Sequence, residues 1–597
     1  MPGRSARIPK AVREARSPSR ARRGHTRKPE RAQNQRGRVF DRRLAVVAAA
    51  VTVALLAAAR YCIDPIGPVA WSWPLLMLCV IAAATAGRAL LGHESAAEEE
   101  GQPSRRFRAA IWLVLLGAAT VPNLHGLGVG FLAEDLGLLR AARLAADPLD
   151  IARFLPLKIF YRPVSLFVWW LGLHLWDASP LGYHLLSVLL HAGNTALLYL
   201  LARRYVGSVV GGAMAALLFA VHPIHVEATT WLAAQPDLLC TAFVLSSMWL
   251  LEHYITSRGR GKHLALAGAL MAFLLALWSK ETAAAILAVA FVRLVIIHDD
   301  RRWARAIGVS AAYALTMGIY LGVRFLVLGQ HWLGGYGIRL AFWDAVLSPT
   351  PWLLTGQLLF PAHVSLFKPL LAPYLSLAAL TLMAAGLLWW MRSLVFVSWQ
   401  RLILYASYLL APMFPVSTAG LIIGADMANS RYGYLPSIGL ALLFGEICAR
   451  QRGGWRRGRA LGVVTVFVAA VLSVWYVMPW REAARLREHL LAEGVRVVAS
   501  LPDSPPPSTV FFKGVPFSHL GAAVFAKWCY AGDLSALLDG QVSVEDVEST
   551  AAAWNAMSAS DLLPGEYLVS WNAESQTMVI ERAGVHPVSE PVAGGPP

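Results

Sequence analysis

The run from Ala109 to Asp135, AAIWLVLLGAATVPNLHGLGVGFLAED, joins a long apolar segment to two neighbouring carboxylates. Residues 109–127 are long and apolar enough to cross the roughly 30 Å of hydrocarbon in a bilayer. A short loop follows and ends on Glu134 and Asp135. Charges close to a membrane are costly and usually serve function rather than packing. The run therefore predicts a membrane-spanning helix with a polar site at one of its ends.

The composition extends this prediction to the whole chain. Of 597 residues, 57% are hydrophobic and only 15% are charged, which excludes a soluble globular or disordered protein and indicates a polytopic membrane protein. The net charge of +17 comes mostly from residues 1–43, where 15 Lys and Arg stand against three acidic residues, a balance of +12. We expect this segment to be a disordered cytoplasmic tail near anionic lipid headgroups, and we expect no nucleic-acid partner.

Thirteen apolar segments are expected to span the membrane. They lie near 44–60, 70–92, 109–127, 181–202, 207–222, 237–254, 263–278, 282–298, 303–326, 369–391, 402–420, 435–449 and 461–480. The first is expected to remain as an uncleaved helix, because its basic flank is too long for a signal peptide. Residues 347–361 are apolar but flanked by proline, so a re-entrant helix and a span both stay open.

The distribution of Lys and Arg predicts the orientation of these spans. Basic clusters lie in the tail and at 105–108, 203–204, 258–262, 301–302, 392–401 and 450–459. Placing all of them in the cytoplasm lets the thirteen spans alternate without conflict. The N-terminus is then cytoplasmic, everything after residue 480 is extracytoplasmic, and we expect the chain in a bacterial plasma membrane.

With this orientation, five polar segments share the extracytoplasmic face. They are 134–135, 161–163, 222–237, 279–281 and 429–437. The first outer loop, 129–180, also contains the tryptophan-rich run 164–176, which is too short for a span and predicts a helix at the membrane interface.

The character of the chain changes at residue 481. A charged helix and a proline linker, 502–507, precede an expected strand at 509–513 and an expected hairpin at 567–571 and 577–580. We therefore divide the chain into the tail 1–43, two extra helices with a cytoplasmic loop at 44–108, a transmembrane module at 109–480, and a small extracytoplasmic α/β domain at 481–597.

The acidic pair has two interpretations. At a membrane surface, Glu134 or Asp135 can act as a general base on an acceptor hydroxyl, with the other carboxylate orienting the acceptor or binding a cation. Alternatively, Asp135 is a helix cap, because it precedes the helical pattern LGLLRAARLAA.

Three cationic side chains lie in the same set of outer loops. Arg162 offers a planar fork that matches phosphate, Lys280 stands beside Glu281, and Arg431 lies between aromatic residues. The competing roles are snorkelling to headgroups for Arg162, a polar turn for Lys280, and interfacial anchoring for the tyrosines around Arg431. Together the three predict binding of a lipid-linked phosphate.

Metal binding is the weaker interpretation of the histidines. His222, His225 and Glu227 have a spacing that could hold a metal, but Pro223 interrupts the helix that would align them. Neutral histidines that hydrogen-bond the turn are favoured. The five cysteines have no CxxC spacing, so we expect neither a zinc site nor a disulfide framework.

These motifs resemble a known family. The chain has Glu134-Asp135, Tyr161-Arg162-Pro163, GYHL (182–185), LLHA (189–192), HPIHVEA (222–228), Gln235-Pro236-Asp237, Ser279-Lys280-Glu281 and RYGYLPS (431–437). In order and approximate spacing they resemble the membrane glycosyltransferases of the GT-C superfamily. The similarity is greatest to the transmembrane and tetratricopeptide-repeat-containing O-mannosyltransferases and their bacterial relatives, over about 110–450.

The resemblance implies an all-α polytopic scaffold of the GT-C type and a polyprenyl-phosphate sugar, most simply mannose, as the donor. It implies Asp135 or Glu134 as the catalytic carboxylate. Arg431, Lys280 and Arg162 are assigned to the donor phosphate, and no cofactor is required, although a divalent metal stays open. The substrate pocket is assigned to Tyr161, His222, His225, Glu227, Asp237, Glu281, Tyr432 and Tyr434.

The chain departs from the family pattern at four points. It has Glu-Asp where the family often has Asp-Asp, Ser430 where Glu commonly precedes the arginine, and Ala234-Gln-Pro-Asp237 in place of Gly-Arg-Ala-Asp. It also has no helical repeat of about 34 residues, the element that accompanies binding of a protein acceptor in the family. This absence weighs against a protein acceptor, and a glycan, a lipid and a protein all stay open as the acceptor.

The sequence favours an inverting transfer to an acceptor hydroxyl on the extracytoplasmic face. A transporter or flippase of lipid-linked sugars is the main alternative, but transporters place polar sites near the bilayer midplane in related halves, and no repeated halves are found here. A glycan-binding scaffold without catalysis is the third class.

Overall fold

The computed structural model describes residues 105–153, 160–257, 259–295, 303–329, 347–361, 397–419, 426–450, 455–501, 509–516, 518–520, 522–525, 533–534, 543–546 and 566–583, with a few single positions between them. All of these residues belong to one compact unit, Thr85–Pro597. The predicted tail 1–43 and the predicted spans at 44–60, 70–92 and 369–391 lie outside the described residues.

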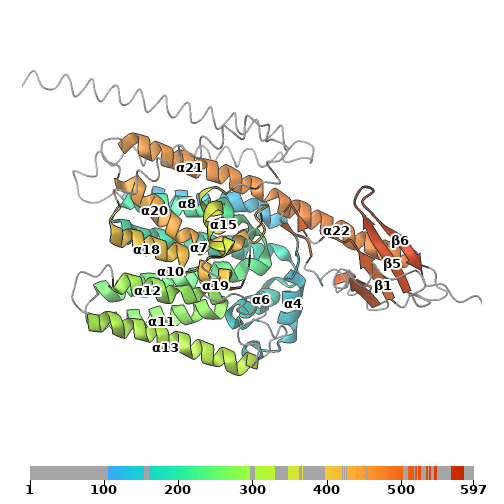
Figure 1. The fold of residues 1–597 in the computed structure, drawn as a ribbon, viewed down its shortest axis with the longest axis horizontal. Coiled ribbons are helices and arrows are strands. Elements are labelled where there is room, and N and C mark those ends of the chain that lie inside the picture. Colours follow the sequence, from blue (N-terminus) through green and yellow to red (C-terminus); the bar gives the residue numbers. More distant parts are fainter. Residues whose placement is uncertain are drawn as a thin grey trace, which may run out of the picture. The chain divides into compact units, whose positions relative to one another are not determined.

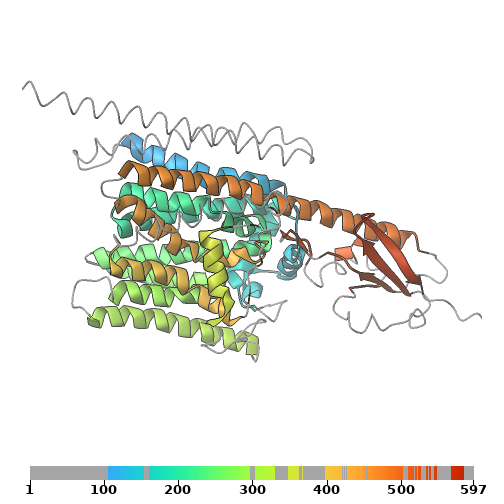
Figure 2. The ribbon, with the colours of Figure 1, turned by 45° about the horizontal axis from the view of Figure 1, so that its top comes forward.

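The long helices run side by side and form a bundle (Figures 1 and 2). They are α3 (Arg105–Thr120), α7 (Pro180–Val206), α8 (Val209–Ala220), α10 (Gln235–Thr256), α11 (Gly261–Ser279), α12 (Ile286–Val295), α13 (Trp303–Leu328), α18 (Trp399–Leu410), α20 (Ser437–Arg450) and α21 (Trp455–Tyr476).

Shorter elements connect the bundle helices and carry most of the predicted site. They are η2 (Val121–Gly128), α4 (Asp135–Leu144), α5 (Pro148–Arg153), α6 (Pro163–Trp176), η3 (Pro223–His225), α9 (Val226–Thr230), η4 (Leu232–Ala234), η5 (Glu281–Ala285), α15 (Pro349–Leu359), α19 (Met413–Thr418) and η7 (Ser430–Gly433). The helix expected at 164–176 is present as α6. The segment 347–361, for which a re-entrant helix and a span were both open, forms the 11-residue helix α15.

The chain is an integral membrane protein. Six of the described helices are long and apolar enough to cross a bilayer, and a seventh arises if α8 and the η3–α9 segment count as one span bent by 48°. Pro223 stands at this bend, at the first position of η3, where it has no N–H to continue the helix. The total of thirteen spans stays a prediction, since α12, α18 and α20 are described over only 10, 12 and 14 residues.

Helices α8 and α20 pack closely because both present glycine at their contact. A Cβ built on Gly445 would lie 2.3 Å from the carbonyl oxygen of Gly211, and a Cβ on Gly211 would lie 2.9 Å from the carbonyl oxygen of Gly445. Small residues that let backbones approach are typical of helix contacts inside membranes, where no hydrophobic effect drives association.

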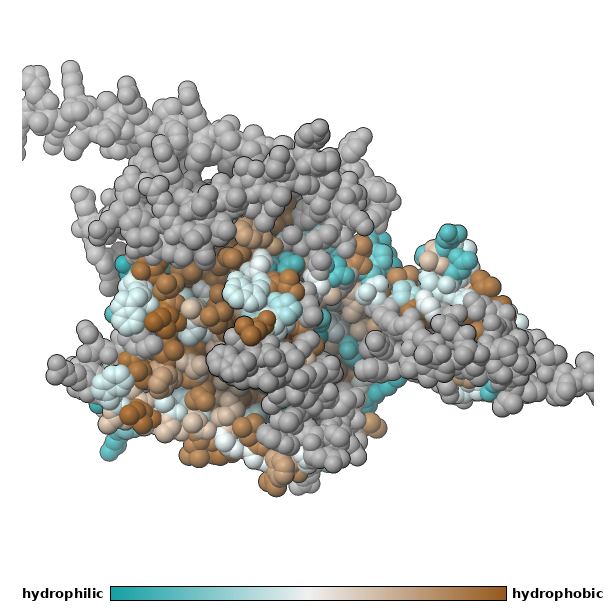
Figure 3. Space-filling model, viewed as in Figure 1, coloured by the Kyte–Doolittle hydropathy of each residue, from teal (hydrophilic) through white to brown (hydrophobic). Residues whose placement is uncertain are grey.

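The outer surface of the bundle is apolar. Hydrophobic residues (brown) gather over the described helices in the face that Figure 3 shows, and hydrophilic residues (teal) lie mostly at its margins. Leu113, Leu264 and Leu326 are each at least 70% exposed, which suits side chains that face lipid rather than water.

Helix α22 (Met478–Ala499) continues from α21 and leads to a four-stranded sheet in the order β4-β1-β5-β6. Strand β1 (Thr509–Lys513) pairs in parallel with β4 (Ser543–Asp546) and β5 (Glu566–Asn572), and β5 pairs antiparallel with β6 (Thr577–Ala583). A second, short hairpin joins β2 (Ser518–His519) to β3 (Ala522–Ala523). The strand expected at 509–513 coincides with β1, and the expected hairpin coincides with β5 and β6.

Candidate active site

The five polar segments predicted to share one face come together in the structure. Arg431 contacts Glu227, Lys280 contacts Asp237, and Arg162 contacts Glu281. The charges of Arg431 and Glu227 in turn act on Glu134. Residues separated by nearly 300 positions in the chain, such as Glu134 and Arg431, thus form one polar cluster at the ends of the bundle helices.

Asp135 is fully buried and supports the backbone around it. Its Oδ2 accepts a hydrogen bond from the Leu132 N–H at 2.8 Å, and its Oδ1 accepts one from the Ala233 N–H at 2.7 Å. Burial raises the pKa of Asp135 well above its ordinary value, against the opposing effect of these two hydrogen bonds. The carboxylate therefore fixes the turn before α4 to the η4 turn. Helix α4 begins at Asp135 itself, and the N–H groups that this side chain satisfies lie outside the first turn of α4.

Glu134, the neighbouring residue, is placed differently. Its side chain is partly buried, and its Oε2 is shielded from solvent yet has no hydrogen-bond partner in the part of the chain that the structure describes. Burial raises the pKa of this carboxyl, and the nearby Arg431 partly offsets that effect. A carboxylate oxygen that is held at a cationic cluster without a partner is available to accept a proton from a bound hydroxyl.

Arg431 lies between two aromatic rings. Its guanidinium stands 4.6 Å from the centroid of the Trp231 ring and 4.7 Å from that of Tyr432. Glu227 accepts hydrogen bonds from the guanidinium of Arg431 and from the backbone N–H of Arg431, the latter at 2.8 Å. Burial alone would lower the pKa of Arg431, but its interactions with Tyr432 and the Glu227 carboxylate raise it, so the guanidinium stays cationic.

Lys280 is almost completely buried beside Arg431. Its ammonium donates to Asp237 Oδ2 at 2.5 Å and lies 4.6 Å from the centroid of the Tyr432 ring. The Tyr432 ring therefore lies near two cations, Lys280 and Arg431, which belong to separate loops. Burial lowers the pKa of Lys280, although the Asp237 carboxylate works in the opposite direction.

Arg162 belongs to a third ion pair. Its guanidinium donates to Glu281 Oε2 at 3.0 and 2.7 Å, and Arg324 donates to the other oxygen of Glu281 at 3.1 Å. Burial alone would raise the pKa of Glu281, but the two guanidinium groups lower it to about 2. Arg324 was not singled out from the sequence, although an arginine inside the apolar run 303–328 is itself a signal of function or pairing.

The charges of the described site nearly cancel without Glu134. Arg162, Lys280, Arg324 and Arg431 face Glu227, Asp237 and Glu281, which leaves one positive charge. The site is therefore a set of cations that are each paired with a carboxylate, and its described charges balance once Glu134 is ionised. Trp231, which holds one face of Arg431, was also missed, because a lone tryptophan in an apolar stretch has no distinguishing pattern.

Tyr432 belongs to this cluster, whereas the other predicted tyrosines and both histidines are held by residues outside it. His222 bonds to the Leu358 carbonyl oxygen at 2.9 Å and accepts from the Ile224 N–H at 3.2 Å, while His225 bonds to Ser437 at 2.9 Å. Tyr434 bonds to His191 and Asn194, and Tyr161 is buried in an apolar cluster. Among the described residues, no group of three or more His, Cys, Asp or Glu is placed to hold a metal ion.

Two departures from the family pattern have a structural account. Ser430, which stands where Glu is common, donates to Glu227 Oε2 at 3.1 Å and so shares the partner of Arg431. Gln235 is buried and donates to the Tyr183 carbonyl oxygen and to Ser187. Both side chains are therefore buried and hydrogen-bonded to described residues around the site.

Comparisons with known proteins agree with the motifs. Residues 161–324 match the family model described as dolichyl-phosphate-mannose-protein mannosyltransferase. Protein O-mannosyl-transferase F38B6.6 of Caenorhabditis elegans is 30% identical over 158 residues, which cover 23% of this chain and 22% of that protein. Protein O-mannosyl-transferase TMTC2 of Homo sapiens is 27% identical over 210 residues, which cover 34% of this chain and 25% of that protein.

The matched segment thus spans at most a quarter of the length of these two relatives. Among solved structures, the crystal structure of ArnT from Cupriavidus metallidurans bound to undecaprenyl phosphate covers 78% of this chain and 93% of its own, with 12% identity and a TM-score of 0.44. That likeness is too distant to assign a site. The sequence matches confirm the resemblance predicted from the motifs: over the segment they share, the chain is related to the transmembrane and tetratricopeptide-repeat-containing protein O-mannosyl-transferases.

Proposed function

We propose that this protein is an inverting membrane glycosyltransferase that moves a sugar, mannose most simply, from a polyprenyl-phosphate donor to an acceptor hydroxyl on the extracytoplasmic face of a bacterial plasma membrane. One observation carries the proposal. The shielded Oε2 of Glu134 has no hydrogen-bond partner among the described residues and lies near Arg431, in a cluster of cations that suits a phosphate group. The acceptor is a hydroxyl of a glycan, a lipid or a protein.

In the proposed reaction, Glu134 accepts the proton of the acceptor hydroxyl while the hydroxyl oxygen attacks the anomeric carbon of the sugar. The bond between that carbon and the phosphate oxygen breaks, and the polyprenyl phosphate leaves with the electron pair. Attack from the side opposite the phosphate inverts the anomeric configuration. Arg431 and Lys280, with Arg162 behind them, stabilise the negative charge that grows on the phosphate.

Glu134 is favoured over Asp135 as the base because the two carboxylates have different surroundings. Both oxygens of Asp135 already accept short hydrogen bonds from backbone N–H groups. Protonating Asp135 would break one of these bonds and loosen the turn that carries Glu134. We therefore assign Asp135 to positioning and Glu134 to proton transfer.

The remaining pocket residues take supporting roles in the proposal. Glu227 and Asp237 each orient one cation, and Glu281 orients two, Arg162 and Arg324. Tyr432 lies against both Lys280 and Arg431. Tyr161, His222, His225 and Tyr434 form the wall behind them. No resident cofactor is proposed, because the donor is a substrate and the cations supply the charge stabilisation.

The test uses the purified full-length chain in lipid vesicles with labelled polyprenyl-phosphate mannose and a simple acceptor alcohol. Release of polyprenyl phosphate with formation of a glycoside supports the proposal. Labelled donor that crosses the bilayer intact, with no glycoside formed, would establish the flippase alternative instead. Donor binding without either event would establish the scaffold alternative, and loss of turnover with a chelator would show that a divalent metal takes part.

A further inference from the structure

We infer that the C-terminal region clamps the loop that carries Glu134, and that Asp533 is a positioning residue for the transfer reaction. The inference rests on the proposed role of Glu134 as the base. It assigns a role in catalysis to residues some 400 positions away from the acidic pair, after α22.

The first evidence is the backbone of the Glu134 loop. Ala133 has φ +43°, a left-handed conformation that a residue with a side chain rarely adopts and that costs on the order of 1 kcal/mol or more. Its N–H donates to the carbonyl oxygen of Val524, just after β3, at 3.1 Å. Such a conformation persists only where neighbouring groups hold it, and here Val524 holds one side of the turn and Asp135 holds the other.

The second evidence is an ion-pair network around Asp533. Asp533 accepts from Arg487 of α22 at 2.8 Å and from Arg140 of α4 at 3.4 Å. The Asp533 and Arg487 side chains are only 4% and 10% exposed, so solvent screens their interaction little. Because α4 begins one residue after Glu134, Asp533 is tied to the helix that continues from the base.

The third evidence is a continuous apolar contact. Val524, Phe525 and Leu534 belong to the same buried cluster as Leu132 and Ala133, the residues directly before Glu134. The Arg487 guanidinium also lies 5.4 Å from the centroid of the Phe525 ring. The C-terminal residues therefore share a hydrophobic core with the loop as well as bonding to it.

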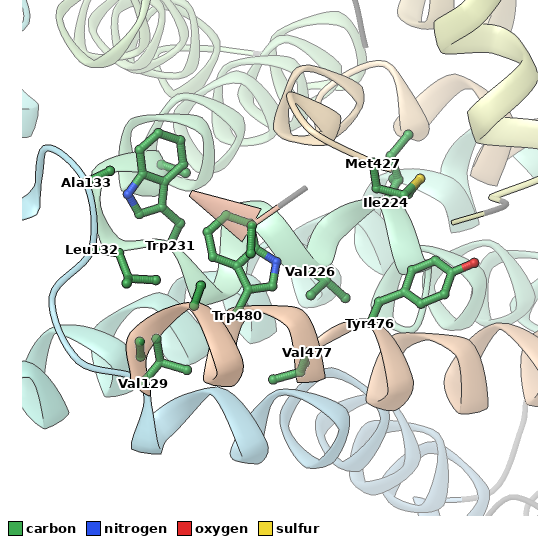
Figure 4. Close-up of a cluster of buried hydrophobic side chains, with 14 of the residues drawn as sticks. Val129, Leu132, Ala133, Ile224, Val226, Trp231, Met427, Tyr476, Val477 and Trp480 are labelled. Atoms are coloured by element: carbon green, nitrogen blue, oxygen red, sulfur yellow. The ribbon is translucent and has the colours of Figure 1, made fainter. Parts of the chain in front are cut away.

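Helix α22 connects the same region to the cation site. Near its start, Trp480 stacks on Trp231 at 6.1 Å, and Trp231 in turn covers Arg431. Figure 4 shows the two indole rings facing each other, with Leu132 and Ala133 beside them. Two turns further along α22, Arg487 bonds to Asp533. Helix α22 therefore contacts both Asp533 and Trp231, the ring that covers Arg431.

The test compares Asp533→Asn with Arg496→Gln in the full-length protein. Arg496 is the matched control, because it lies on the same helix in an exposed ion pair with Glu493. We expect Asp533→Asn to speed hydrogen exchange of the Ala133 amide at least about tenfold. We also expect turnover to fall by roughly ten- to a hundredfold, because misplacing a catalytic group by about 1 Å can cost 10²-fold.

The donor KM should stay within about twofold, since Arg431 and Lys280 do not contact Asp533, and Asp533→Glu should recover part of the turnover. Unchanged exchange at Ala133 in a folded Asp533→Asn protein would overturn the clamp, whatever the activity. Faster exchange with unchanged turnover would overturn the positioning role. If Asp533→Asn does not fold, Arg140→Gln removes the more exposed of the two ion pairs, and the same two readouts decide. Because exchange is measured without substrate, the clamp can fail or hold independently of the proposed reaction.

Discussion

Asp135→Asn is expected to lower stability, whereas Glu134→Gln is expected to lower turnover and leave stability intact. Asp135 is fully buried, and each of its oxygens accepts a backbone N–H at 2.7–2.8 Å. Asparagine has only one oxygen, so its NH₂ group must face one of these N–H donors. One buried donor is then left without an acceptor, which costs about 1–3 kcal/mol.

Glu134→Gln removes a carboxylate whose pKa burial already raises. Because the Glu134 Oε2 has no hydrogen-bond partner among the described residues, the glutamine amide leaves no described backbone donor without an acceptor, and stability should be nearly unchanged. Turnover should instead fall by about 10²–10⁴-fold, the usual contribution of a general base.

The assay measures the apparent melting temperature and the donor turnover of both variants in the same detergent and lipid. We expect a lower melting temperature for Asp135→Asn and a wild-type melting temperature for Glu134→Gln. A folded Asp135→Asn protein with wild-type stability and no turnover, beside an active Glu134→Gln protein, would refute the division of roles and make Asp135 the base.

Three further predictions concern the base, the phosphate site and the bundle. Burial raises the pKa of Glu134, and this residue must be ionised to act as the base. In a pH–rate profile, kcat/KM should therefore rise with pH around a pKa above the ordinary value of a glutamate. A rise centred near pH 4 would contradict this prediction. Arg431→Lys keeps the positive charge but loses the planar guanidinium that Glu227 and two aromatic rings orient. Donor turnover should therefore fall by about 10²–10³-fold. Wild-type kinetics would show that the reaction does not use the guanidinium geometry. Gly445→Ala places a Cβ 2.3 Å from the Gly211 carbonyl oxygen and should cost about 1–3 kcal/mol of stability, measured by thermal unfolding against Gly193→Ala, whose Cβ would meet nothing within 4 Å.

The convergence of the polar loops could be predicted from the sequence because charge and hydropathy act over whole segments. Placing the basic loops in the cytoplasm put the loops of Arg162, Lys280 and Arg431 on one face, and the structure pairs each of these cations with a carboxylate. The strand at Thr509–Lys513 could also be predicted, because its run of apolar and aromatic residues is bounded by a proline linker.

The division of roles within the site could not be predicted in this way. Glu134 and Asp135 are adjacent and chemically alike, and only the direction of the backbone after Ala133 decides which carboxylate bonds to Leu132 and Ala233. Ala133 itself gave no signal, since a left-handed alanine is held by tertiary contacts and not by local preference. Arg324 and Asp533 were missed for a related reason, because the oppositely charged partners that they engage lie 43 and 46 or more positions away in the chain.

The most direct test of the account is the rate of polyprenyl phosphate release by the Glu134→Gln protein, measured in lipid beside the wild type and beside Glu574→Gln. Glu574 is an exposed carboxylate in the turn between β5 and β6, so its loss controls for charge alone. The account predicts release at the wild-type rate for Glu574→Gln and a loss of at least about a hundredfold for Glu134→Gln with its fold intact. Release at the wild-type rate by a folded Glu134→Gln protein would contradict the assignment of Glu134 as the base.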